Sequence, residues 1–386
     1  MVTVVEVSGL IDPVVADFVE SQVTEANASG VVAIVLQLNS EGTVVSDSRL
    51  DELVATIEAS AVPVVVWVGP SGSQARGGAT RLITAADVSG LAPGSRVEVT
   101  PELAAGADLA GLTAVGEFAN AETAVDAGLV DNDAPVIGDF IVNLDGVRTE
   151  VNDDGPQPRR QPVTQVRFTQ LSLVSQLMHT VASPAVAYLL FIIGLGLLVF
   201  ELFTAGIGIA GVVGAGSLVL GSYGLAVLPT RTWAIGLLLL AMFGFAVDVQ
   251  VGAPRFWTAV GTVSFVIGSI ALYDGVTVSW ITLVVGILGM VVAMISGMPA
   301  MVRTRFSTPT IGREWMIGET GEAVAAVDPE GVVRIREAPW RARTNRATPI
   351  APGERVRVTS IEGLILEVEP EAGGARDHRE RRNTKL

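Results

Sequence analysis

The sequence lacks cysteine and is nearly free of lysine and histidine. Without cysteine, disulfide bonds, thiol catalysis and thiolate metal sites are excluded, and we expect neither a metal site nor a cofactor. Lys385 in the C-terminal tail is the only lysine, and the histidines are His179 and His378. Residues 1–170 therefore hold no amine or imidazole that could take a proton from a serine. Neither a Ser–Lys dyad nor a Ser–His–Asp triad can be assembled within them.

Charged residues are also few, at 17% of the chain against 49% hydrophobic residues. The apolar excess lies between Ser183 and Pro299, which predicts an integral membrane protein with soluble ends. Residues 1–154 carry 24 acidic and 5 basic side chains, so the net charge of −15 resides at this end. Such an acidic domain repels phosphate backbones, and we expect no nucleic-acid partner.

Residues 1–150 alternate β-branched apolar runs with helical segments. Asp12-Pro13 has the form of a helix start, and Gly30 that of a helix end. The β-α-β-α-β order predicts an α/β domain with a largely parallel sheet. Residues 151–182, rich at first in Pro, Asp and Arg, are predicted to form a linker and juxtamembrane segment.

A transmembrane bundle of about five helices is predicted for residues 183–302, because a span needs about 20 apolar residues. The third and fourth predicted spans are short. The five segments are residues 184–203, 206–228, 232–248, 256–273 and 278–298. Glu201 ends the first span, where it is either a functional carboxylate in lipid or a structural cap near the interface. Its neighbours favour the cap.

Arginines near the spans bear on topology in the plasma membrane. Three of them closely follow the last span (Arg303, Arg305, Arg313). The positive-inside rule places that end in the cytoplasm, so five spans would place the N-terminal domain outside. Three more precede the first span (Arg159, Arg160, Arg167), and no signal peptide leads into Val2. Either a signal lies upstream of Met1, which we favour, or the span count is even.

Residues 310–371 contain five short segments that alternate apolar with charged residues, and glycines and prolines separate them. This pattern predicts a small β-barrel of the OB type. The tail, residues 372–386, is polar and predicted to be disordered. Two tryptophans and a set of arginines could form an exposed binding face, or a barrel core and an ordinary solvated wall. These residues are Trp315, Trp340, Arg334, Arg336 and Arg341.

Several stretches resemble the long form of the NfeD family, which joins a ClpP-class serine protease domain, a membrane bundle and an OB-fold domain. The most specific are C-terminal: Ile317–Ala323, Pro329–Arg334, Trp340–Ala342 and Gly353–Val358. Phe200-Glu201-Leu202 resembles the family's first membrane turn. Glu6–Asp12 and Thr123–Asp131 resemble the opening and closing segments of its protease domain.

The resemblance places the nucleophilic serine in the run Pro70–Thr80, but Gly77 stands at that position. The oxyanion loop keeps Gly42 and has Thr43 in place of a second glycine. The helix that would carry the lysine base is missing between Thr100 and Thr113.

Two features near this degenerate site have alternative interpretations. Ser71 and Ser73 are loop serines or, less favoured, a relocated nucleophile. The amides of Gly77 and Gly78 either start a helix or grip a peptide carbonyl or an anion.

We therefore expect a non-enzymatic membrane scaffold that contacts lipid and self-associates. The resemblance implies a stomatin-like or flotillin-like partner, with the OB domain as the docking module and the protease-like domain as a peptide-binding or oligomerising part. One alternative is a membrane serine endopeptidase with atypical catalytic groups. Another is a small transporter or channel, which the scarcity of polar residues in the spans disfavours.

Overall fold

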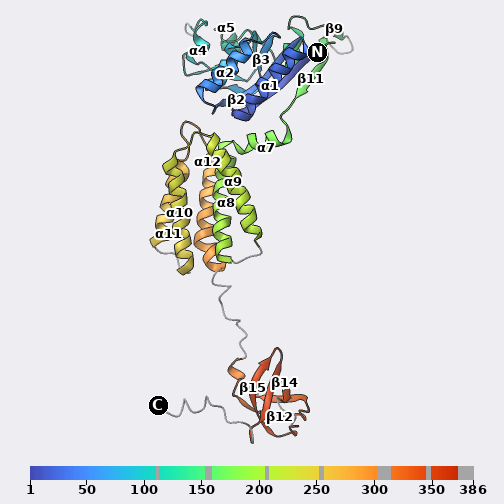
Figure 1. The fold of residues 1–386 in the computed structure, drawn as a ribbon, viewed down its shortest axis with the longest axis vertical. Coiled ribbons are helices and arrows are strands. Elements are labelled where there is room, and N and C mark those ends of the chain that lie inside the picture. The colour runs from blue at the N-terminus through green and yellow to red at the C-terminus, as the bar shows by residue number, and fades with distance from the viewer. Residues whose placement is uncertain are drawn as a thin grey trace. The chain divides into compact units, whose positions relative to one another are not determined.

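The computed structural model describes residues 1–109, 113–152, 159–204, 208–251, 256–301, 314–344 and 349–372. The chain divides into two compact units, Met1–Val302 and Arg303–Leu386. Figure 1 shows an α/β domain and a helical bundle in the first unit and a small barrel in the second.

The N-terminal domain is built on a parallel sheet, as its strand-helix alternation predicts. Asp12 starts α1, because its side chain accepts a hydrogen bond from Val15 N–H while Pro13 fills the first helical position. In the sheet, β1 pairs with β2, β2 with β3, β3 with β5 and β5 with β8, all parallel. The elements are β1 Val2–Ile11, α1 Pro13–Ser29, β2 Ala33–Thr43, α2 Asp47–Glu58, β3 Val64–Val68, β5 Val88–Leu91 and β8 Asn132–Asp133.

A second, smaller strand set branches from the end of β2. Ser40 of β2 pairs with Ala75 of β4, β4 pairs with β6, and β6 pairs with β7. The strands are β4 Gln74–Ala75, β6 Arg96–Glu98 and β7 Phe118–Asn120. Short helices lie between these strands, namely η1 Gly77–Thr80, α3 Arg81–Thr84 and α4 Pro101–Ala104, and two more follow β7, namely α5 Ala121–Asp126 and α6 Ile137–Val142. The branch brings the end of β2 beside the turn after β4, where the candidate site lies.

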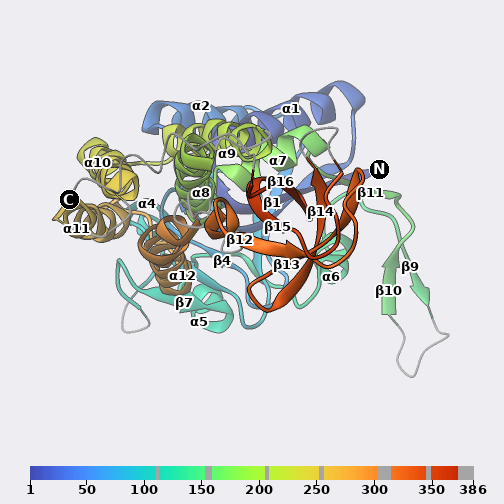
Figure 2. The same cartoon turned by 90° about the horizontal axis from the view of Figure 1, so that it is seen from below.

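Residues 151–182 are more structured than the predicted linker. β9 (Thr149–Asn152) and β10 (Arg159–Pro162) form an antiparallel hairpin that stands apart from the sheet in Figure 2. β11 (Val166–Thr169) then adds to β1 in parallel, and α7 (Leu173–Val181) follows. β11 was not predicted because it has only four residues, and its pairing with β1 carries no local signal in the sequence.

The bundle contains α8 Pro184–Thr204, α9 Ile209–Val227, α10 Thr232–Val251, α11 Phe256–Ile270 and α12 Trp280–Val292, which η2 Ala293–Gly297 extends. Four of these helices are long and apolar enough to cross a membrane, whereas α11 is shorter. The helices approach closely at glycines. A methyl group on Gly221 would lie 2.5 Å from the Phe191 nitrogen, and one on Gly244 would lie 2.7 Å from the Trp257 oxygen. Small residues therefore hold α8 against α9 and α10 against α11.

The C-terminal unit is a closed five-stranded barrel, as predicted, in the order β12-β13-β14-β16-β15. A short helix, η3 (Glu314–Met316), precedes it. Its strands are β12 Thr320–Ala323, β13 Glu330–Ile335, β14 Ala338–Thr344, β15 Arg355–Glu362 and β16 Ile365–Pro370. Alternate strand residues such as Val333, Val356 and Leu366 are fully buried and fill the interior. The tail predicted to be disordered, beyond residue 372, lies outside the described residues.

Candidate functional site

A cavity of about 480 Å³ lies where β2 ends beside the turn after β4. It gathers Gly42, Thr43, Gly77 and Gly78, the four positions that the sequence assigned to the degenerate protease site. The remaining lining residues are Leu10, Glu41, Gln74, Arg76, Arg96, Glu98, Phe118, Gly275, Val276 and Thr277. The last three belong to the loop between α11 and α12, so the cavity borders the membrane bundle.

The amide of Gly77 is bound by a carboxylate of this chain. Gly77 has a positive φ of 52° and starts η1, and its N–H donates to Glu98 Oε2 at 2.9 Å. Arg76 Nε lies 3.4 Å from the same oxygen. Glu98 comes from β6 and is 21% exposed. The amide nest that could hold a substrate carbonyl or an anion is therefore filled, at Gly77, by an internal anion.

Thr43 occupies the space beside Gly78. A methyl group on Gly78 would lie 2.5 Å from Thr43 Oγ1 and 2.9 Å from Leu50 Cδ2. Gly42 has a φ of 139°, a backbone conformation that favours glycine. The loop that the resemblance assigns to oxyanion binding thus packs directly against the start of η1.

Ser71 and Ser73 do not line this cavity. The Ser71 hydroxyl donates to the Pro93 carbonyl oxygen. Ser73 is 3% exposed, and its N–H donates to Ser95 Oγ at 3.1 Å. Both serines thus take part in the turn that holds β4 and β6 together.

Two arginines give the cavity rim its positive charge. The Arg96 guanidinium lies 4.5 Å from the centre of the Phe118 ring and donates through Nη2 to Gln74 Oε1 at 2.9 Å. Arg76 faces Glu98, as described above. Lysine and histidine are absent from the lining. The cavity can therefore bind polar or charged groups, but its lining offers a hydroxyl no amine or imidazole as a base.

A histidine from outside the predicted domain reaches its sheet. His179 on α7 places Nδ1 2.9 Å from Asp12 Oδ2 and Nε2 3.1 Å from the Ser8 carbonyl oxygen. The hydrogen bond to Asp12, which is 1% exposed, raises the pKa of His179. Both ring nitrogens face acceptors, so the imidazolium form fits this position. In that form the ring is a donor to two groups and cannot serve as a base.

The pair of His179 and Asp12 was not predicted from the sequence. A buried Asp at a helix start and a lone histidine more than 160 positions later carry no joint pattern.

Two carboxylates in the bundle act as caps. Glu201 Oε1 accepts a hydrogen bond from Gly208 N–H at 3.2 Å, at the start of α9. Asp248 is 4% exposed, and its Oδ2 accepts from both the N–H and the hydroxyl of Thr258. In each case the carboxylate binds the N-terminal end of the next helix, where backbone donors are free.

The barrel's tryptophans and arginines lie in different surroundings. Trp340 packs against the barrel core, whereas Trp315 is 48% exposed and lies under the Arg336 guanidinium, 4.3 Å from the ring centre. Arg341 lies 3.7 Å from Glu330, and Arg334 faces Glu322 across β12 and β13. No group of three or more potential metal ligands occurs among the described residues of the chain.

Comparisons with known proteins match the membrane bundle and the barrel as separate domains. Residues 185–298 match the NfeD integral membrane domain, and residues 313–370 match the NfeD-like C-terminal, partner-binding domain. The chain is 25% identical over 411 residues to the membrane-bound protease PH1510 of Pyrococcus horikoshii, covering 95% of this chain and 93% of that one.

Solved structures show similar parts. One is the 1510-N membrane protease specific for a stomatin homolog from Pyrococcus horikoshii. It is 19% identical, and the match covers 47% of this chain and 98% of that chain with a TM-score of 0.36. Another is the C-terminal domain of the stomatin operon partner protein 1510-C from the same organism. It is 41% identical, and the match covers 16% of this chain and 95% of that chain with a TM-score of 0.16. Residues 185–298 and 313–370 thus form a membrane domain and a C-terminal domain of the NfeD type, and with a ClpP-like fold ahead of them the chain is similar to long-form NfeD proteins along its length.

Proposed function

We propose that this protein is a membrane scaffold of the NfeD type whose protease-like domain has no catalytic nucleophile. The observation that carries this proposal is the hydrogen bond from Gly77 N–H to Glu98, at the position where the resemblance places the family's nucleophile. The chain's only lysine is Lys385, and both ring nitrogens of His179 face acceptors, at Asp12 and Ser8. No described amine or imidazole near Gly77 is therefore placed to activate a hydroxyl.

The partner we propose is a stomatin-like or flotillin-like membrane protein that docks on the barrel. The match to a partner-binding domain supports this, as do the names of two similar proteins, a membrane protease specific for a stomatin homolog and a stomatin operon partner protein. On the barrel, the stacked pair Trp315 and Arg336 offers an exposed aromatic and cationic contact of the kind enriched at interfaces. We further propose that the scaffold self-associates, contacts membrane lipid and lies in the plasma membrane.

Co-purification of the full chain with the stomatin-like protein of the same genome tests the docking. We expect Arg336→Ala and Trp315→Ala to reduce recovery of the partner at least fivefold. The matched control is Arg355→Ala, which removes a barrel arginine that pairs with Glu371 at 2.8 Å elsewhere on the surface. Unchanged recovery with Arg336→Ala, or equal loss with Arg355→Ala, would overturn this docking surface.

A serine endopeptidase with atypical groups is the second candidate, because the relative PH1510 is named a membrane-bound protease. It predicts that the purified chain cleaves the partner's hydrophobic segments and that Ser71→Ala or Ser73→Ala stops cleavage. The scaffold proposal predicts no cleavage by the unmodified chain.

We also propose that the N-terminal domain is extracytoplasmic and the barrel cytoplasmic. The α9–α10 and α11–α12 loops share one end of the bundle, because Arg231 N–H donates to the Leu272 carbonyl and Arg231 Nη2 lies 2.7 Å from Asp274. This supports five alternating helices, with α12 running away from that end.

A further inference from the structure

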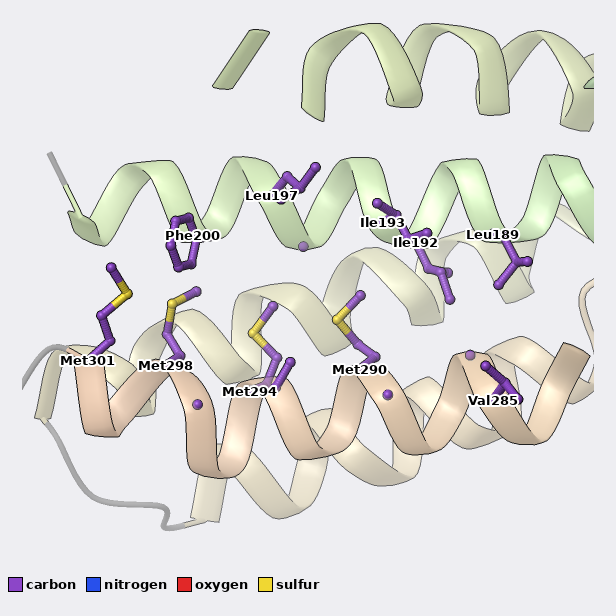
Figure 3. A pocket seen from close by; sticks show the side chains of 15 residues that line it. Leu189, Ile192, Ile193, Leu197, Phe200, Val285, Met290, Met294, Met298 and Met301 are labelled. Carbon is purple, nitrogen blue, oxygen red and sulfur yellow. The ribbon is translucent and has the colours of Figure 1, made fainter. Parts of the chain in front are cut away.

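A groove of about 600 Å³ runs between α8 and α12 within the membrane domain (Figure 3). All fifteen lining residues are apolar, so the groove offers a ligand no hydrogen bond from a side chain. They are Leu189, Ile192, Ile193, Gly196, Leu197, Phe200, Val285, Gly286, Gly289, Met290, Ala293, Met294, Gly297, Met298 and Met301.

Methionines of α12 and its π-helical extension form one wall. Figure 3 shows Met290, Met294 and Met298 reaching from this wall toward α8. Methionine is unbranched and polarizable, so such a wall adapts to an irregular apolar ligand. The π-helical turn Ala293–Gly297 lies in the same wall, and such turns occur frequently at functional sites.

The glycines of the groove fall into two kinds. A methyl group on Gly286 would lie 2.7 Å from the Tyr188 ring, and one on Gly196 would lie 2.8 Å from Met290 Cε, so packing within the chain requires both. A methyl group on Gly289 or Gly297 would meet no atom within 4 Å. These two positions keep open a space that no described part of the chain fills.

The length of the groove indicates what fills it. Its α8 wall runs from Leu189 to Phe200, or ~17 Å, and its α12 wall from Val285 to Met301, or ~24 Å, at the helical rise of ~1.5 Å per residue. Both walls are longer than one leaflet of the hydrocarbon core, ~15 Å deep, and shorter than the ~30 Å core that a spanning partner helix would cross. The groove therefore matches a chain that enters at the Met301 end, passes the bilayer midplane and stops short of the opposite face.

We propose that the α8–α12 groove binds one phospholipid acyl chain, which enters from the leaflet at the Met301 end. In lipid, apolar contact alone brings no hydrophobic gain, so retention depends on van der Waals packing in the groove. Larger side chains that fill the groove from α12 should therefore displace the acyl chain.

Native mass spectrometry of the full chain, purified in detergent from phospholipid membranes, tests this proposal. We expect one retained phospholipid per chain and at least a tenfold lower occupancy in the double variant Gly289→Leu/Gly297→Leu. The control is Gly216→Leu/Gly236→Leu on α9 and α10, where a methyl group also meets no atom within 4 Å but the groove is not involved. Retention equal to the control would overturn the proposal.

A second measurement does not depend on how these variants fold. A phospholipid with a photoactivatable diazirine in its acyl chain should crosslink the unmodified protein chiefly within residues 189–200 and 285–301. Crosslinks spread equally over α9 and α10 would contradict a specific site. If the unmodified protein is instead a lipid-free dimer and the filled variant a monomer, the occupant is a second copy and the proposal is wrong.

Discussion

At position 77 a glycine stands where the resemblance places a nucleophile, and its N–H donates to Glu98 at 2.9 Å. A carboxylate that accepts a backbone N–H and faces a guanidinium satisfies both groups, so it stabilises the turn after β4. The same contact keeps a substrate carbonyl away from this amide.

Glu98→Ala should lower the thermal midpoint of the purified chain. Removing the carboxylate leaves the partly buried Gly77 N–H without its acceptor, at a cost of about 1–3 kcal/mol. For a domain of this size, that corresponds to a fall of about 2–4 °C for each kcal/mol, measured by differential scanning fluorimetry. Glu102→Ala, at an exposed position in α4, is the control. An equal shift in both variants would contradict a specific role for Glu98.

Gly78→Ala should also destabilise the domain, because its methyl group would lie 2.5 Å from Thr43 Oγ1. Overpacking of this kind typically costs about 1–3 kcal/mol. Thr43→Gly in the same chain should recover most of the loss, since it removes the group that clashes. Gly106→Ala, where a methyl group meets nothing within 4 Å, should change little. Failure of Thr43→Gly to rescue would show that the clash is elsewhere.

Helix α7, which precedes the membrane bundle, is tied to the N-terminal domain through the contact between His179 and Asp12. His179 on α7 meets Asp12 at the start of α1, and the same carboxylate accepts from Val15 N–H. Asp12 thus holds the ends of two elements at once. The Asp12 carboxylate also interacts electrostatically with Tyr223 on α9.

This contact predicts a pH dependence of α7 docking. Asp12 raises the pKa of His179 above its ordinary value of 6.5 in the folded state. A raised folded-state pKa contributes stability that is fully present below the unfolded pKa and is lost as the pH rises through the folded one. The thermal midpoint should therefore fall as the pH rises from about 6 upward.

His179→Gln should flatten this pH profile above pH 6, and His378→Gln, in the tail, should leave it unchanged. The measurement is a series of melting curves between pH 6 and 9. A profile that keeps its slope in His179→Gln would contradict the assignment.

The sequence predicted most elements from their periodicity, and it failed where contacts join distant segments. β-branched runs such as Val64–Val68 and the alternation in Arg355–Glu362 predicted strands of the sheet and the barrel. The contacts of Glu98 with Gly77 depend on β6 lying beside β4, which is a tertiary pairing without a local signal. β11 was missed for the same reason, because only its pairing with β1 distinguishes it from a linker.

At the scale of the whole molecule, the two matched domains lie on either side of residues 299–312, and the topology of the chain decides which compartment each domain faces. Since α11 has only 15 residues, its length alone does not decide whether it completes a crossing. The shared end of the α9–α10 and α11–α12 loops favours an odd number of crossings.

The absence of cysteine makes this topology directly measurable. In intact cells, Ser21→Cys on α1 should react with a membrane-impermeant maleimide, and Ala351→Cys on the barrel should react only after lysis. Both side chains are exposed in the structure. Labelling of both cysteines in intact cells, or of neither, would contradict opposite placement of the two domains.

The central claim, that no activated serine exists in the protease-like domain, is tested most directly with a fluorophosphonate probe. The full chain would be incubated with the probe, and its intact mass would then be measured. We expect less than a tenth of the chains to carry the adduct, with no change in Ser71→Ala or Ser73→Ala. Stoichiometric labelling that one of these substitutions abolishes would contradict the account.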